Sequence, residues 1–129
     1  MNIEWREATK AGDLYKVCEL LDAWVDINSL DEHGQTALMN AAHSGDIKLT
    51  QVLIQRGADL NHTAKYWLIA LMLAVISNHP GIVRLLVEAG ADMEIKGSKG
   101  HCERTPLEYA QENGRADIVS ILRKNALNF

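Results

Sequence analysis

The sequence lacks the charge pattern of a protein that binds nucleic acid or a membrane surface. Its 129 residues carry 13 Lys and Arg against 17 Asp and Glu, a formal net charge of −4, and the basic residues form no cluster. Both kinds of binding rely on a basic patch or a basic amphipathic helix. We therefore expect neither nucleic acid nor a membrane among its partners.

Long apolar stretches are also missing. The longest run, from Trp67 to Ile76, is about half of what a transmembrane helix needs. The N-terminal stretch MNIEWREATKAGD mixes charged and apolar residues and has no apolar signal core. With 47% apolar and 23% charged residues, the composition is that of an ordinary globular domain. These features predict one intracellular, cytoplasmic domain over residues 1–129.

Catalytic and metal-binding motifs are equally scarce. The two cysteines, Cys18 and Cys102, lie far apart without metal-type spacing, so we expect free thiols in a reducing compartment. The HExxH, GxSxG, GxGxxG and EF-hand patterns do not occur. The sequence therefore predicts no enzyme, no cofactor and no small-molecule substrate.

The sequence does contain an internal repeat. Gly57-Ala58-Asp59 recurs 33 residues later as Gly90-Ala91-Asp92, and Thr36-Ala37-Leu38-Met39 recurs as Ile69-Ala70-Leu71-Met72. Thr105-Pro106-Leu107-Glu108 follows after a further 36 residues. Four units result, at about 1–29, 30–61, 62–94 and 95–129.

Each unit predicts two antiparallel helices preceded by a turn-rich finger. Small side chains such as Ala37, Ala41 and Ala42 share one face of the first helix, which lets the next helix approach closely. Gly57 stands where a second helix needs a left-handed C-terminal residue. The segment 31–34 has Asp first and Gly fourth, as a type I turn prefers.

A 33-residue period with a TPLH-like box, an alanine-rich helix and a terminal Gly-Ala-Asp resembles the ankyrin repeat. The resemblance spans essentially the whole chain, although the His of the box is replaced by Met39, Met72 and Glu108. It implies an all-α solenoid of helix-turn-helix units with β-turn or hairpin fingers. It also implies a non-catalytic module that binds a protein through its concave face, made by the finger tips and the exposed edge of the first helices.

Metal binding is not expected from the histidines. His33 and Cys102 occupy equivalent finger positions two units apart, on the order of 20 Å, which is too far to share a metal ion. His101 beside Cys102 offers two ligands without a third. His79 fills a Gly-His position before a second helix, which is typical of a structural residue.

The register of the family predicts which residues face a partner. By position they are Lys10, Ala11, Glu32, His33, Gln35, His43, Ser44, Lys65, Tyr66, Leu68, Ile76, Ser77, His101, Cys102, Arg104, Glu112 and Asn113.

The third unit departs from the pattern toward large apolar residues. Trp67 replaces the finger glycine Gly34, and Ile69 replaces the N-cap Thr36. Leu68 and Ile76 stand where the second unit has Gln35 and His43, and Trp24 stands where Gly57 and Gly90 close later helices. Local rules broken together in one direction indicate a functional site. We therefore expect an exposed patch of Tyr66, Trp67 and Leu68 flanked by Ile76; the alternative is that Trp67 folds down and is buried.

Several readings of this patch remain open. It predicts a protein partner, or self-association of two copies as a homodimer. An engineered interface on a natural scaffold would give the same pattern, and the chain could also be a regulatory fragment of a larger enzyme. Trp5 either covers the open end of the core or contacts a partner. If the patch is exposed, replacing Trp67 by Gly together with Ile69 by Thr leaves the fold intact or more stable.

Overall fold

The computed structural model describes residues 1–64, 68–97 and 103–126. Within these ranges the chain forms helices and turns and contains no strand. The helices are α1 (Ile3–Ala11), α2 (Leu14–Asp22), α3 (Ala37–Ser44), α4 (Ile47–Gln55), α5 (Ala70–Ile76), α6 (Pro80–Glu88), α7 (Pro106–Glu112) and α8 (Ala116–Ala126).

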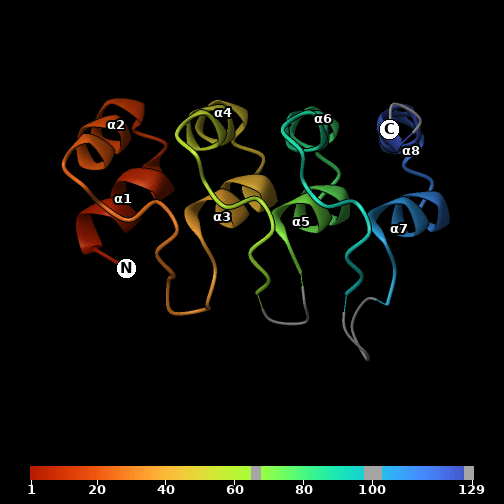
Figure 1. Cartoon of the computed structure of the whole chain (residues 1–129), viewed down its shortest axis with the longest axis horizontal. Helices are drawn as coiled ribbons and strands as arrows, with labels where there is room; N and C mark the ends of the chain where they lie inside the picture. Colours follow the sequence, from red (N-terminus) through yellow and green to blue (C-terminus); the bar gives the residue numbers. More distant parts are fainter. Residues whose placement is uncertain (65–67, 98–102, 127–129) are drawn as a thin grey trace.

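The helices form two rows (Figure 1). The inner row is α1, α3, α5 and α7, next to the fingers, and the outer row is α2, α4, α6 and α8. Each inner helix contacts the outer helix that follows it and the next inner helix along the chain. The predicted all-α solenoid of stacked helix pairs is thus confirmed.

Tight turns join the two helices of each pair. Gly12, Gly45, Asn78 and Gly114 end the inner helices with positive φ. Asparagine tolerates this conformation better than most residues, which explains how the third unit dispenses with glycine. The outer helices α2 and α4 then begin at N-caps, where Asp13 and Asp46 accept hydrogen bonds from Lys16 N and Leu49 N.

In the third and fourth units, the turn between the two helices carries a side chain that donates a hydrogen bond to the preceding unit. His79 Nε2 donates to the carbonyl of His43 in the preceding unit over 3.2 Å, and Arg115 Nη2 donates to the carbonyl of Ile76 over 3.3 Å. Both carbonyls belong to the last turn of an inner helix, where C=O groups lack a partner within the helix. His79 makes no side-chain cap on its own helix. The predicted structural role of His79 therefore consists of tying one unit to the next.

A second set of polar contacts runs between the outer helices and the fingers. Asn28 Oδ1 accepts from Asp59 N, and Asn61 Oδ1 accepts from Asp92 N, each over 2.8 Å. The recurring aspartates thus lie in structural turns, as their repetition in the sequence predicts.

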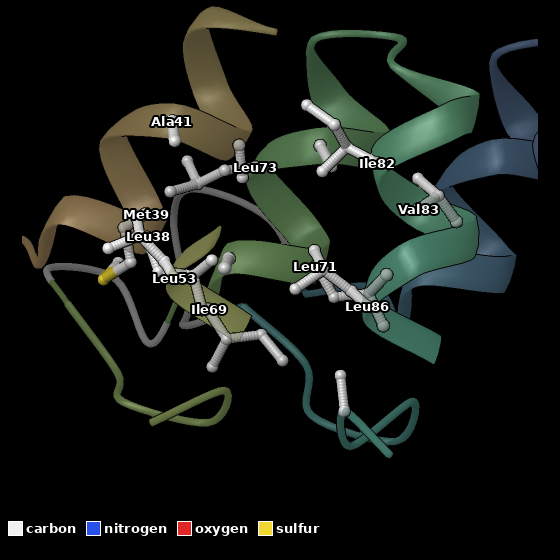
Figure 2. Packing of buried hydrophobic residues seen from close by; sticks show 14 of the residues in the cluster. Leu38, Met39, Ala41, Leu53, Ile69, Leu71, Leu73, Ile82, Val83 and Leu86 are labelled. Carbon is white, nitrogen blue, oxygen red and sulfur yellow. The ribbon is translucent and has the colours of Figure 1, made fainter. Parts of the chain in front are cut away.

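The core runs continuously through the helix pairs. Figure 2 shows Leu53, Ile69 and Leu71 gathered in the interior of the second and third units. Trp5 is completely buried at the first unit, so it covers the core at this end.

The exposed patch predicted for the third unit is wrong at Leu68, and the neighbouring Ile69 does not reach the surface either. Leu68 is only 8% exposed and Ile69 is completely buried. Ala64 N donates to Leu68 O just as Asp31 N donates to Gln35 O, so the described ends of the two fingers are joined by equivalent hydrogen bonds. The aliphatic side chain of Leu68 gains by packing onto the core, whereas Gln35 at the equivalent position is only partly buried. Lys65, Tyr66 and Trp67 lie outside the described residues.

Candidate protein-binding face

A groove opens between the first and second units. It has a volume of about 380 Å³ and is bounded by α1, α3 and the second finger. We call it the first groove; it is lined by Met1, Arg6, Thr9, Lys10, Asp31, Glu32, His33, Ala37, Asn40, Ala41, Ser44 and Asp46. The small side chains of Ala37 and Ala41 leave this space open between the two inner helices.

The acidic wall of the first groove is held in place by Asp31. Its carboxylate accepts hydrogen bonds from His33 N, Gln35 N and Asn40 Nδ2 over 2.8–3.0 Å. Burial raises the pKa of Asp31, but these hydrogen bonds to the charged form outweigh it, so the pKa lies below its ordinary value. The finger is thus ordered before any partner arrives.

Glu32 bridges the two walls of the groove. Its carboxylate lies 3.0 Å from Arg6 Nη1 and 3.7 Å from His33 Nε2. The pKa of Glu32 is lowered, first by its own backbone N–H and then by the positive charge of Arg6. Both partners of the Arg6–Glu32 pair are more than half exposed, so the pair orients side chains more than it stabilises the fold.

The same face continues over the second and third units. His43 Nδ1 and Ser77 Oγ are hydrogen-bonded at 3.0 Å between the ends of α3 and α5. Ile76, next to Ser77, is half-buried against the core. These residues join two inner helices through exposed polar groups.

Over the fourth unit the face carries a charged pair. Arg104 Nε donates to both oxygens of Glu112, at 2.8 and 2.9 Å. Thr105 and Glu108 form a capping box at the start of α7, which holds Thr105, the residue after Arg104, in place. The pKa of Glu108 is lowered, chiefly by hydrogen bonding from the backbone and side chain of Thr105.

The structure separates the predicted site residues into groups. Glu32, His33 and Lys10 line the first groove. His43 is exposed, whereas Gln35, Ile76 and Arg104 are partly buried. Leu68 belongs to the core. Lys65, Tyr66, Trp67, His101 and Cys102 lie outside the described residues.

Trp24 lies on the outer row of helices, away from the inner row (Figure 1). It follows the C-cap of α2 in the outer row, whereas the fingers project from the opposite side of the inner row (Figure 1). Its side chain is 93% exposed. The prediction that Trp24 contacts a partner therefore concerns a different surface from the concave face.

Sequence reasoning missed Arg6, Thr9 and Asn40 as groove residues. Arg6 could have been found, because it lies one helical turn before Lys10 and so shares its face. Asn40 gave no such signal, because its role depends on the hydrogen bond to Asp31, nine residues earlier.

Among the residues that the structure describes, no cluster of three or more His, Cys, Asp or Glu could hold a metal ion. The described helices include none that is both long and apolar enough to cross a membrane. Cys18 is a free, half-buried thiol on α2.

Comparison with known proteins identifies the family. A family profile described as ankyrin repeats, three copies, matches residues 6–97. No curated protein matches the chain. Since the profile covers most of the sequence, and the structure is an all-helical stack of paired helices, the chain belongs to the ankyrin repeat family.

Proposed function

We propose that this chain is a non-catalytic module that binds a protein partner through its concave face, with the first groove as the main contact. Ankyrin repeats are generally protein-interaction modules. The observation that supports this face is the groove of about 380 Å³ with charged walls that are already ordered. A preformed surface loses little conformational entropy on binding, so more of the contact energy appears as affinity.

The groove walls favour a partner segment with both charged and apolar groups. Lys10 is exposed and has no ion-pair partner among the described residues, so it is free to accept a carboxylate. The alanines at the bottom provide room for an apolar side chain. His43, Ser77 and the Arg104–Glu112 pair extend this surface along the inner row.

On the basis of the sequence, the proposed surface also includes Lys65, Tyr66 and Trp67 of the third finger and His101 and Cys102 of the fourth. The helix pair α7/α8 would serve as a fourth repeat beyond the three matched copies. Since Leu68 and Ile69 are core residues, their apolar character requires no engineered interface. We propose a cytoplasmic location, consistent with the free thiol of Cys18.

The groove can be tested with peptides selected against the purified protein from a random peptide display library. We expect the best peptide to shift the amide resonances of Arg6, Lys10, Glu32 and His33. Ser44→Trp, which fills the groove from an exposed position, and Lys10→Glu should each weaken the peptide about tenfold or more. Lys48→Glu on the exposed side of α4 is the matched charge control and should leave the affinity unchanged.

Resonance shifts confined to the outer row, or unchanged affinity in Ser44→Trp, would contradict the proposal. Self-association through the third finger predicts a different result. Light scattering coupled to size exclusion would then show dimers at high micromolar concentration that Trp67→Gly converts to monomers.

A further inference from the structure

Trp24 combines a strained backbone with an exposed side chain. Its φ is 70°, in the left-handed region, and its N–H donates to Leu21 O over 3.1 Å to close the end of α2. The equivalent positions in the next two units are Gly57 (φ 87°) and Gly90 (φ 98°). Because it has no Cβ, glycine adopts this conformation without the steric clash that a tryptophan incurs.

The fold gains nothing visible in exchange for this strain. The side chain of Trp24 is 93% exposed, whereas Trp5 in the same unit is completely buried. A glycine would close α2 with less strain, as Gly57 closes α4. A strained outlier that contributes nothing to packing indicates a role outside the fold, and exposed tryptophans are the residues most often found at interface hot spots.

The surroundings of Trp24 are acidic. Asp22 and Asp26 flank it in the sequence, and both are exposed. The backbone N–H of Asn28 donates to the Asp26 carboxylate, and the side-chain oxygen of Asn28 accepts from Asp59 N. These bonds bring the exposed Asp59 to the same edge. Arg56 from the next unit already pairs with Asp22. The carboxylates of Asp26 and Asp59 accept only nearby backbone N–H groups within the described part of the chain.

We propose that Trp24, Asp22, Asp26 and Asp59 form a second docking site, the Trp24 edge, for a protein segment that carries lysine or arginine beside an apolar residue. Tryptophan is the aromatic side chain that attracts such cations most strongly. The carboxylates around it complement the same positive charges and repel an acidic segment. The Trp24 edge lies in the outer row, so it can be occupied while the concave face holds another partner. It extends the proposed function and does not depend on it.

The probe is a fluorescein-labelled ten-residue peptide of alternating lysine and leucine, compared with one in which glutamate replaces lysine. We expect the lysine peptide to bind about tenfold or more tightly by fluorescence anisotropy. Trp24→Gly should weaken it about tenfold or more and, because strain is relieved, raise the melting midpoint. Asp26→Asn with Asp59→Asn should weaken the lysine peptide and, because repulsion of the glutamate peptide is relieved, narrow the difference in affinity between the two peptides.

Tyr15→Lys is the matched control. Tyr15 is an aromatic residue of α2 that is 92% exposed, and the equivalent residue of the second unit is Lys48. This variant should bind the lysine peptide within about twofold of the unaltered chain, after allowing for the added charge. Ser44→Trp, which blocks the first groove, should not change this binding at all.

Three outcomes would overturn the proposal. The first is that Trp24→Gly and the unaltered chain bind the lysine peptide with equal affinity. Binding would then depend on the net negative charge of the chain and not on Trp24. The second is a lowered melting midpoint in Trp24→Gly. The third is concentration-dependent self-association in sedimentation that Trp24→Gly abolishes; the occupant would then be a second copy, whose residues 95–129 carry six Lys and Arg against four Asp and Glu.

Discussion

Ile69 shows how one position can serve the core instead of a helix end. It occupies the N-cap of α5 but makes no side-chain cap, whereas Thr36 at the equivalent position of α3 accepts from Met39 N over 3.2 Å. In return, the Ile69 side chain is completely buried (Figure 2). Burying such a side chain contributes about 1.5–3 kcal/mol, more than the ~1 kcal/mol of a typical cap.

Ile69→Thr should therefore lower the free energy of unfolding by no more than about 1 kcal/mol, since a restored cap offsets part of the lost apolar contact. The sequence predicts that Ile69→Thr together with Trp67→Gly leaves the fold intact or more stable; the burial of Ile69 argues against the threonine half of that prediction. Ile69→Ala, which neither caps nor fills the space, should cost about 2–5 kcal/mol. Urea denaturation would measure both; an alanine variant as stable as the threonine variant would contradict this account.

The sequence predicted the backbone role of these residues but not their burial. The 33-residue period makes Leu68 equivalent to Gln35, and the backbone carbonyl of each does accept the same hydrogen bond within its own finger. Whether a side chain at such a position points inward depends on how well it packs with its neighbours. A repeat pattern contains no such packing information, and so the apolar character of Leu68 was wrongly taken as a sign of exposure.

At the scale of the elements, asparagine side chains link successive turns. Asn28 and Asn61 each accept the backbone N–H of an aspartate in the following unit. Glu94 stands at the next equivalent position, and its side chain has no hydrogen-bond partner among the described residues. The series thus connects the first three units.

Asn61→Ala should lower the free energy of unfolding by about 1–2 kcal/mol, because Asp92 N loses its acceptor. Glu94→Ala is the matched control at the equivalent position and should stay within about 0.5 kcal/mol of the unaltered chain. Amide hydrogen exchange should also show faster exchange at Asp92 in the first variant only. Equal stability of the two variants would argue against the link.

The elements themselves were largely predictable, whereas the first groove was not. The helix pairs and their turns follow from local patterns that repeat, and the capping box follows from the Thr-x-x-Glu spacing of Thr105 and Glu108. The groove depends on Ala37 and Ala41 of one unit facing Arg6 and Lys10 of another. Whether a groove forms there depends on the sizes of side chains on α1 and α3, two helices that are distant in the sequence.

At the scale of the whole molecule, each unit is stabilised mainly by its neighbours. The helices α7 and α8 pack on α5 and α6, and Trp5 covers the core at the first unit. In such a stack, stability is approximately the sum of unit and interface terms. Loss of an end unit should therefore weaken the remainder without abolishing its structure.

A chain that ends at Gly97 should keep most of its helical circular dichroism but unfold at a lower urea concentration. Val83 and Leu86, buried in the full chain, belong to the unit that loses its covering helices. The denaturant dependence of unfolding should fall by roughly a quarter, in proportion to the surface removed. An unchanged midpoint would show that the fourth helix pair behaves as an independent unit.

The contacts of His79 and Arg115 limit how the units can be exchanged. Each side chain reaches backward to a carbonyl at the end of an inner helix, so the donor always belongs to the later unit. A transplanted third or fourth unit needs a predecessor whose helix ends at the right distance. Chimeras assembled from ankyrin units should therefore keep His79 or Arg115 in the same fragment as the helix end whose carbonyl it binds.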